Sequence, residues 1–218
     1  MNIHLYLENN INMLKKLIFP TGKCHPKYVQ YISWSFLSNI ISSTLDTLGT
    51  HCTLSVIGSI DNNVIASYNY IGKNLLGQIG SLYYILNAGS NIDKNPRKYL
   101  NTSIILNSTS IYIECITPLL PVNSFLFVAG SANLLKNISW TSYGSVNAKI
   151  IQTLSIDNNI SEIYSKINVL NTISSSIGMC VGLGLTAKIP DNNVRLSIIP
   201  ILTFLRWYTL NKAIKDLI

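Results

Sequence analysis

Charged residues are nearly missing from long stretches of this chain. Residues 167–187 contain none, residues 99–135 contain only Glu114, and residues 28–72 contain two acids and one histidine. Over the whole chain 11% of the residues are charged, against roughly a quarter in typical soluble domains. A helix on the surface of a soluble protein carries charges on its outer face. The sequence therefore predicts helices that are buried inside the protein or in contact with lipid.

Two of these stretches are long enough to cross a membrane. A bilayer core about 30 Å thick needs about 20 apolar residues in one helix. Residues 167–187 and 99–119 reach that length, although both contain Ser, Thr or Asn and the second contains Glu114. The hydrophobic share is 48% and the mean hydropathy +0.31, so the chain lies between soluble proteins and Leu-rich membrane bundles. Buried helices of a soluble all-α protein and helices lying in the membrane interface remain alternatives.

The periodicity and the turn residues predict an all-α protein, a bundle of about six helices that is membrane-embedded or membrane-associated. Proline and glycine mark the helix ends, with Pro96 opening one helix and Pro118 ending it. Gly49 is a predicted break and Pro200 a predicted kink. We expect residues 1–18 to be a short N-terminal extension and residues 19–218 to form one domain. The expected helices cover residues 26–57, 64–86, 96–118, 123–153, 161–186 and 194–218.

Several function classes find no support in the sequence. The net charge of +7 is scattered instead of gathered in a patch, which argues against nucleic-acid binding. The four cysteines and three histidines have no metal-ligand spacing, so we assign no metal site. No Ser/His/acid arrangement identifies a nucleophile, so we assign no catalytic residue. The N-terminus lacks the apolar core of a signal peptide, and we expect neither cleavage nor secretion.

The N-terminal part of the domain carries a distinctive motif. Residues 19–34 read FPTGKCHPKYVQYISW, a turn-rich segment followed by Tyr28, Tyr31 and Trp34 at every third position. This spacing places the three rings along one side of a helix. The pattern FPxGxxxPxYxxYxxW resembles the opening motif of the root UVB sensitive family.

Four further blocks resemble the same family in the same order. Residues 73–80, KNLLGQIG, are similar to its KDGxGxxG, and residues 93–99, DKNPRKY, to its DxxPKxW. Residues 114–121, ECITPLLP, are similar to ExxTPxxP, and residues 159–166, NISEIYSK, to NxxDxxAK. The chain departs from the family at Asn74, which replaces an acid, and at Leu100, which replaces an arginine. A Ser-Gln pair of the family is Val169-Leu170 here, so part of the family's polar site is altered.

The resemblance implies a role in membrane-linked homeostasis or stress response, as a carrier, scaffold or regulator without catalysis. The family's link to vitamin B6 status adds a small phosphorylated ligand as a hypothesis, and no cofactor is assigned. The expected partners are the lipid bilayer and a second copy or a related family member; the expected location is a membrane of unknown organelle. Two alternatives stay open. One is an enzyme or ligand-binding protein with a polar pocket around Lys73, Glu114 and Lys166, and the other is a soluble helical interaction module.

The candidate ligand-binding residues follow from these blocks and from charge isolation. A carboxylate such as Glu114 in an uncharged helix must be paired, protonated or exposed to water. It could equally be a structural charge near a helix end. Glu162 and Lys166 stand four apart, which also suits an ordinary helix-surface pair. The GxxxG spacing of Gly178 and Gly182 predicts close helix packing, within the chain or across a dimer. The candidate ligand-binding set is Lys73, Asn74, Glu114, Asn159, Glu162 and Lys166.

Overall fold

A computed structural model describes residues 15–218 of the chain. The predicted extension at residues 1–18 therefore lies largely outside the described residues. Residues 15–218 contain no β-strand, only an isolated bridge between Cys24 and Ser155. The predicted all-α class is confirmed. The elements in chain order are α2 (Tyr28–Gly58), α3 (Asn63–Ile92), α4 (Pro96–Ile116), η1 (Thr117–Leu119), η2 (Val122–Ser124), α5 (Phe125–Leu154), α6 (Ile160–Lys188) and α7 (Asn192–Ala213).

Local sequence accounts for most of the helix ends. The Asn62 side chain accepts from the backbone N–H groups of Val64 and Ile65 and caps the start of α3. Asp191 caps α7 in the same way, and Pro96 occupies the first turn of α4. The predicted break at Gly49 was wrong, because α2 continues through it to Gly58.

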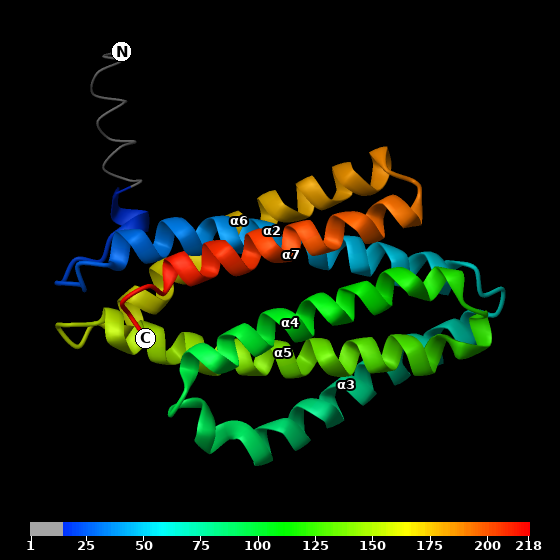
Figure 1. Ribbon diagram of the computed structural model, residues 1–218, viewed down its shortest axis with the longest axis horizontal. Coiled ribbons are helices and arrows are strands. Elements are labelled where there is room, and N and C mark those ends of the chain that lie inside the picture. Colours follow the sequence, from blue (N-terminus) through cyan, green and yellow to red (C-terminus); the bar gives the residue numbers. More distant parts are fainter. Residues whose placement is uncertain (1–14) are drawn as a thin grey trace, which may run out of the picture.

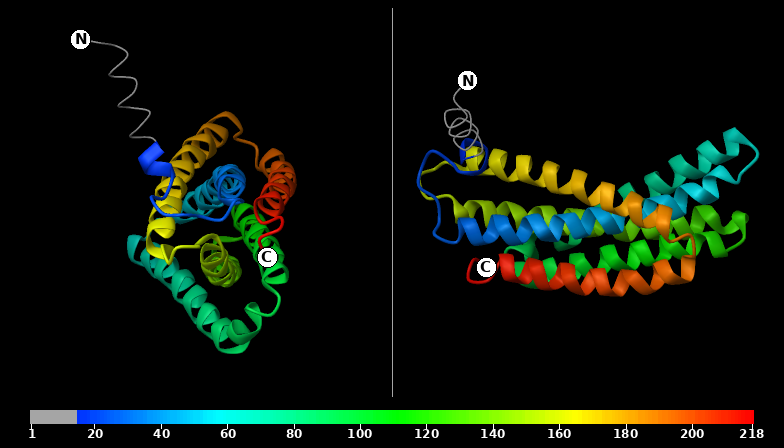
Figure 2. Two further views of the ribbon diagram at one scale, coloured as in Figure 1. Left: turned by 90° about the vertical axis from the view of Figure 1, so that its left-hand side faces the viewer. Right: turned by 90° about the horizontal axis from the view of Figure 1, so that it is seen from above.

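The six long helices run back and forth along one axis (Figure 1). Both ends of the described chain therefore lie at the same end of the bundle. Seen along this axis, α2 occupies the centre (Figure 2), and it contacts α6, α7 and α4. Helix α3 lies on the outside and packs mainly against α5.

The aromatic motif packs into the largest part of the core. Tyr28 and Tyr31 are each 1% exposed, and Trp34 packs against the same cluster. The Tyr28 hydroxyl donates to the carbonyl of Ile18 at 2.7 Å, and the Tyr31 hydroxyl donates to Asn147 Oδ1 at 2.8 Å. The three-residue spacing thus fastens the start of α2 to the segment before it and to α5.

Two glycines lie where α6 crosses α2. A Cβ atom on Gly178 would lie 2.4 Å from the Ile40 carbonyl oxygen, and one on Gly182 would lie 2.6 Å from the Thr47 Cβ. No side chain fits in either gap, so these positions allow the backbones to approach closely. The structure therefore places the GxxxG pair in a contact within the chain.

One helix of the described part, α6, is long and apolar enough to cross a membrane by length and composition. Its apolar window has a mean hydropathy of 1.4, and only 22% of it is buried inside the protein. The other predicted segment, residues 99–119, does not meet this criterion. It corresponds to α4, whose buried side includes Leu100, Ile104 and Ile111.

Candidate functional site

A group of charged side chains meets inside the bundle. We call Asp46, Lys73, Glu114 and Lys136 the internal cluster. Lys136 Nζ donates to Glu114 Oε2 at 2.6 Å and lies 3.8 Å from Asp46 Oδ1. Glu114 is 4% exposed and Lys73 8% exposed. Four different helices supply these groups, so the cluster forms only when the bundle is assembled.

Small residues make room for the cluster. A Cβ atom on Gly49 would lie 2.2 Å from Glu114 Oε2, so only glycine leaves space for the carboxylate in this position. Gly77 does the same between α3 and α5, where a Cβ would lie 2.5 Å from the amide nitrogen of Asn133. The same Asn133 nitrogen donates to the Lys73 carbonyl at 3.0 Å. Gly77 and Asn133 together fix the position of α3, and therefore of Lys73.

A cavity of about 200 Å³ lies beside the internal cluster. Its lining includes Lys73, Glu114 and Lys136, and the walls come from α2, α3, α4 and α5. The remaining lining residues are Thr50, Thr53, Leu54, Tyr70 and Asn133. A partly open cavity with cations, a carboxylate and hydroxyl groups can hold a small polar molecule.

The expected pocket of Lys73, Glu114 and Lys166 is not formed, and this is a correction. Lys73 and Glu114 line the cavity, whereas Lys166 Nζ donates to the backbone carbonyl of Lys16. Lys166 belongs to the second turn of α6, beside the residues that precede α2, while the cavity lies beside the last turns of α2.

The NxxDxxAK-like block holds the N-terminal loop, which we define as residues 19–27. Glu162 accepts from the backbone N–H of Thr21 at 2.9 Å, and the Asn159 amide donates to the Lys23 carbonyl at 3.2 Å. The bond from the Thr21 backbone lowers the pKa of Glu162 below its ordinary value. These residues are arranged to fasten the loop to the start of α6.

Sequence reasoning missed Lys136, Asp46 and Gly49. Lys136 is the first charged residue after Glu114 in the sequence, which is the one signal that could have paired them. The structure also brings together two cysteines that the sequence separates. The sulfur atoms of Cys52 and Cys115 lie 3.3 Å apart in the core. Cys115 directly follows Glu114 in the sequence.

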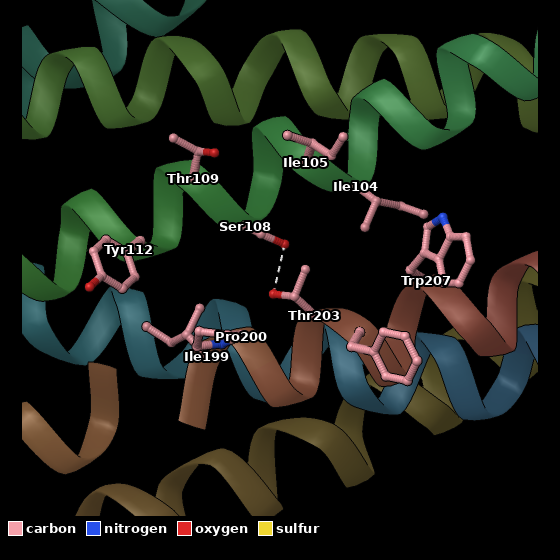
Figure 3. Close-up of a pocket in the computed structure, with 10 residues that line it drawn as sticks. Ile104, Ile105, Ser108, Thr109, Tyr112, Ile199, Pro200, Thr203 and Trp207 are labelled. Atoms are coloured by element: carbon pink, nitrogen blue, oxygen red, sulfur yellow. Dashed lines mark hydrogen bonds between the residues drawn. The ribbon is translucent and has the colours of Figure 1, made fainter. Parts of the chain in front are cut away.

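A larger groove between α4 and α7 has a different character (Figure 3). It measures about 430 Å³ and is lined by side chains such as Ile104, Pro200 and Trp207. Ser108 and Thr203 bridge it with a hydrogen bond of 3.0 Å, and no Asp, Glu, Lys, Arg, His or Cys lines it. Its chemistry suits apolar contact, so the internal cluster is the stronger candidate site.

Residues 15–218 contain no group of three or more His, Cys, Asp or Glu side chains placed to hold a metal ion.

Comparisons with known proteins identify the family of the chain. Residues 7–217 match the family model described as "Vitamin B6 photo-protection and homoeostasis domain". The chain belongs to the root UVB sensitive family. It is 26% identical over 180 residues to protein root UVB sensitive 4 of Arabidopsis thaliana, covering 81% of this chain and 34% of the relative. No solved structure matches the chain significantly.

Two other relatives show how far the match extends. Protein root UVB sensitive 3 of Arabidopsis thaliana is 24% identical over 92% of this chain and 46% of its own length. RUS family member 1 of Dictyostelium discoideum is 25% identical over 83% of this chain and 36% of its own length. The chain thus spans between a third and a half of these root UVB sensitive proteins. The family resemblance read from the five sequence blocks is confirmed.

Proposed function

We propose that this root UVB sensitive protein is embedded in a membrane and acts without catalysis, as a carrier or regulator of a small polar compound. The observation that carries the proposal is the distribution of charge along the bundle. Four charged side chains of the described residues lie in the middle of helices, and two more lie in the last turn of α4 and the first turn of α7; none of these six is exposed. They are Asp46, Lys73, Glu114, Lys136, Arg195 and Arg206.

The remaining described charges gather at the two ends. We call the end with residues 15–27 and the C-terminus the basic end, at the left of Figure 1. It carries eleven Lys and Arg against four Asp and Glu, whereas the opposite end carries Lys188, Asp61 and Asp191. Such separation is expected of a bundle whose middle contacts hydrocarbon and whose ends contact water.

The surface between the ends exposes many large apolar side chains. Helix α3 exposes one aliphatic or aromatic side chain after another, and its only charged residue, Lys73, points into the cavity. Large exposed apolar side chains of α3 include Val64, Ile65, Tyr68, Ile71, Leu75, Ile79, Leu82, Tyr83 and Leu86. Even the shortest long helix, α4 with 21 residues, rises about 32 Å, enough for a hydrocarbon core of about 30 Å. Lipid is the partner that suits this surface.

The carrier or regulator role rests on the internal cluster. Charges within a membrane bundle are costly and usually mark a path or binding site for a solute. The family description names vitamin B6 homoeostasis, and a small phosphorylated compound is compatible with a polar cavity. The enzyme alternative loses one of its three residues, because Lys166 lies outside the cavity.

Membrane embedding can be tested with the native thiol of Cys180, which is exposed on the outer side of α6. We expect carbonate extraction to leave the protein in the membrane fraction. In sealed membranes, Cys180 should resist a membrane-impermeant maleimide, and it should react once the protein is unfolded in detergent. A matched control is the Lys98→Cys variant in a Cys180→Ser background, since Lys98 is exposed at the basic end. Opened vesicles give the reagent access to both ends.

Release of the protein by carbonate, or labelling of Cys180 as fast as the control, would overturn the proposal. The soluble interaction module would then be the better description, with another protein covering the apolar surface of α3 and α6.

A further inference from the structure

The cavity beside the internal cluster contains one cation without an acidic partner. Lys73 Nζ is 3.2 Å from Asn74 Oδ1 and 4.8 Å from the centre of the Tyr70 ring. No carboxylate among residues 15–218 lies within ion-pair distance of it. An ammonium group has three donors, so two remain unused in a side chain that is 8% exposed. Burying a charge in this state is unfavourable unless something pairs with it.

The two acids of the cluster share the other ammonium, Lys136. Glu114 Oε2 accepts a hydrogen bond from Lys136 Nζ at 2.6 Å, and Asp46 Oδ1 lies 3.8 Å from the same ammonium. A metal ion or organic cation entering the cavity would find its carboxylate occupied and would meet the positive charge of Lys73. At the Lys73 ammonium, which has no ion-pair partner among the described residues, the cavity therefore favours a negative group.

The interior as a whole has an excess of positive charge, which comes from two arginines, Arg195 and Arg206, that do not line the cavity. Four buried or half-buried cations, Lys73, Lys136, Arg195 and Arg206, face two acids. Arg206 Nη1 is buried and has no hydrogen-bond partner among the described residues. Uncompensated positive charge in a low-dielectric interior attracts an anion more strongly than the same charge would in water.

We infer that the cavity binds a small oxyanion, a phosphate or carboxylate group, with Lys73 Nζ as its charged donor. This inference rests on the proposed function, because it names the class of compound that the internal site holds. The volume of about 200 Å³ is below the roughly 300–1,000 Å³ of pockets for drug-sized ligands, and suits a small anion. Thr50 lines the cavity and its hydroxyl can add a hydrogen bond.

The residue after Lys73 keeps this ammonium free of an internal acid. Asn74 offers it only a neutral amide oxygen, at 3.2 Å. An aspartate there would place a carboxylate beside Lys73 and pair it within the protein. The neutral amide leaves the ammonium free for a ligand.

The test uses the full chain purified in detergent, with thermal unfolding followed during titration. Sodium phosphate and sodium acetate are compared with sodium chloride at equal ionic strength. We expect a saturable rise in Tm with phosphate, with acetate, or with both, and which salt acts identifies the oxyanion. Lys73→Met should weaken binding about tenfold or more, as expected for losing a charged hydrogen bond. Lys98→Met, at an exposed lysine of the basic end, should bind as the unchanged protein does.

Asn74→Asp gives a second measurement that keeps the lysine. It should fold at least as well as the unchanged protein and still lose saturable binding, because the new carboxylate occupies Lys73. Glu114→Gln should bind the anion more tightly, since it removes a negative charge from the cavity wall.

The absence of any saturable shift, or equal binding by Asn74→Asp, would overturn the anion site. That result leaves membrane embedding intact if Cys180 stays protected. Conversely, release of the protein by carbonate overturns the membrane proposal, whatever the titration shows.

Discussion

The internal cluster and the contacts of the N-terminal loop use the same kinds of side chain in opposite surroundings. Glu114 and Lys136 form an ion pair of 2.6 Å in the core, where Glu114 is 4% exposed. Glu162 lies at the surface of the basic end and accepts from Thr21. A buried charge that loses its partner has no water to replace it, whereas an exposed one does. Burial therefore decides which of the two polar groups the fold depends on.

The largest effect should come from Lys136→Met. Removing this ammonium leaves Glu114 and Asp46 without their ion-pair partner, and breaking a buried pair from one side costs about 3–5 kcal/mol. We expect a large fall in Tm in detergent, with Lys98→Met as the unaffected control.

Adding Glu114→Met to Lys136→Met should recover much of the loss, because an apolar pair of similar size leaves fewer charges unpaired. A double variant as unstable as the sum of the single variants would show that the pair itself is not the source of the effect.

The second effect concerns Gly49. Alanine at this position would place its Cβ 2.2 Å from Glu114 Oε2, so the carboxylate must move and its bond to Lys136 must lengthen. We expect Gly49→Ala to cost about 1–3 kcal/mol, as overpacking does in other cores, measured by thermal unfolding. Gly144→Ala is the matched control, since a Cβ there meets no atom within 4 Å. Equal behaviour of the two variants would argue against the tight contact at Gly49.

The sequence predicted the helices better than the site, for a physical reason. Helix ends depend on local residues such as Asn62, Pro96 and Asp191, which are visible in the chain. The partner of Glu114 depends on how α4 and α5 face each other, and no local pattern encodes that. The role of Gly49 was misread for the same reason. Taken alone it resembles a helix break, and only the neighbouring helix shows that it accommodates a carboxylate.

The sequence also predicted one ligand set where the structure has two separate groups. Glu114 and Lys166 looked alike because both fall in family blocks and both are charged. Periodicity within α6 cannot show that its first turns face the N-terminal loop. That information comes from the packing of residues 16–23 against α6.

A smaller effect is expected at the N-terminal loop. Glu162→Gln keeps the shape of the side chain and removes its charge, so the bond from the Thr21 backbone becomes weaker. We expect faster hydrogen exchange at Thr21, with a fall in Tm smaller than that of Gly49→Ala. Tyr164→Phe on the same helix is a suitable control, because Tyr164 is 52% exposed and the substitution changes no charge. A fall in Tm as large as that of Lys136→Met would contradict the comparison between the two groups.

The smallest effect is a pH dependence at the same loop. The folded protein holds the pKa of Glu162 below its ordinary value of 4.5, first of all through the Thr21 backbone N–H. A carboxyl group with a lowered pKa stabilises the fold fully above its unfolded pKa, and this contribution is lost as the pH falls through the folded value. The protection factor of the Thr21 amide, taken relative to its intrinsic exchange rate, should therefore be constant above about pH 4.5 and decrease below it. In Glu162→Gln the decrease should disappear, since no proton can be taken up there. If the wild-type decrease persisted in that variant, the loop would be released by another acid, and Asp157, which accepts from the Lys23 backbone N–H at 2.9 Å, would be the residue to replace next.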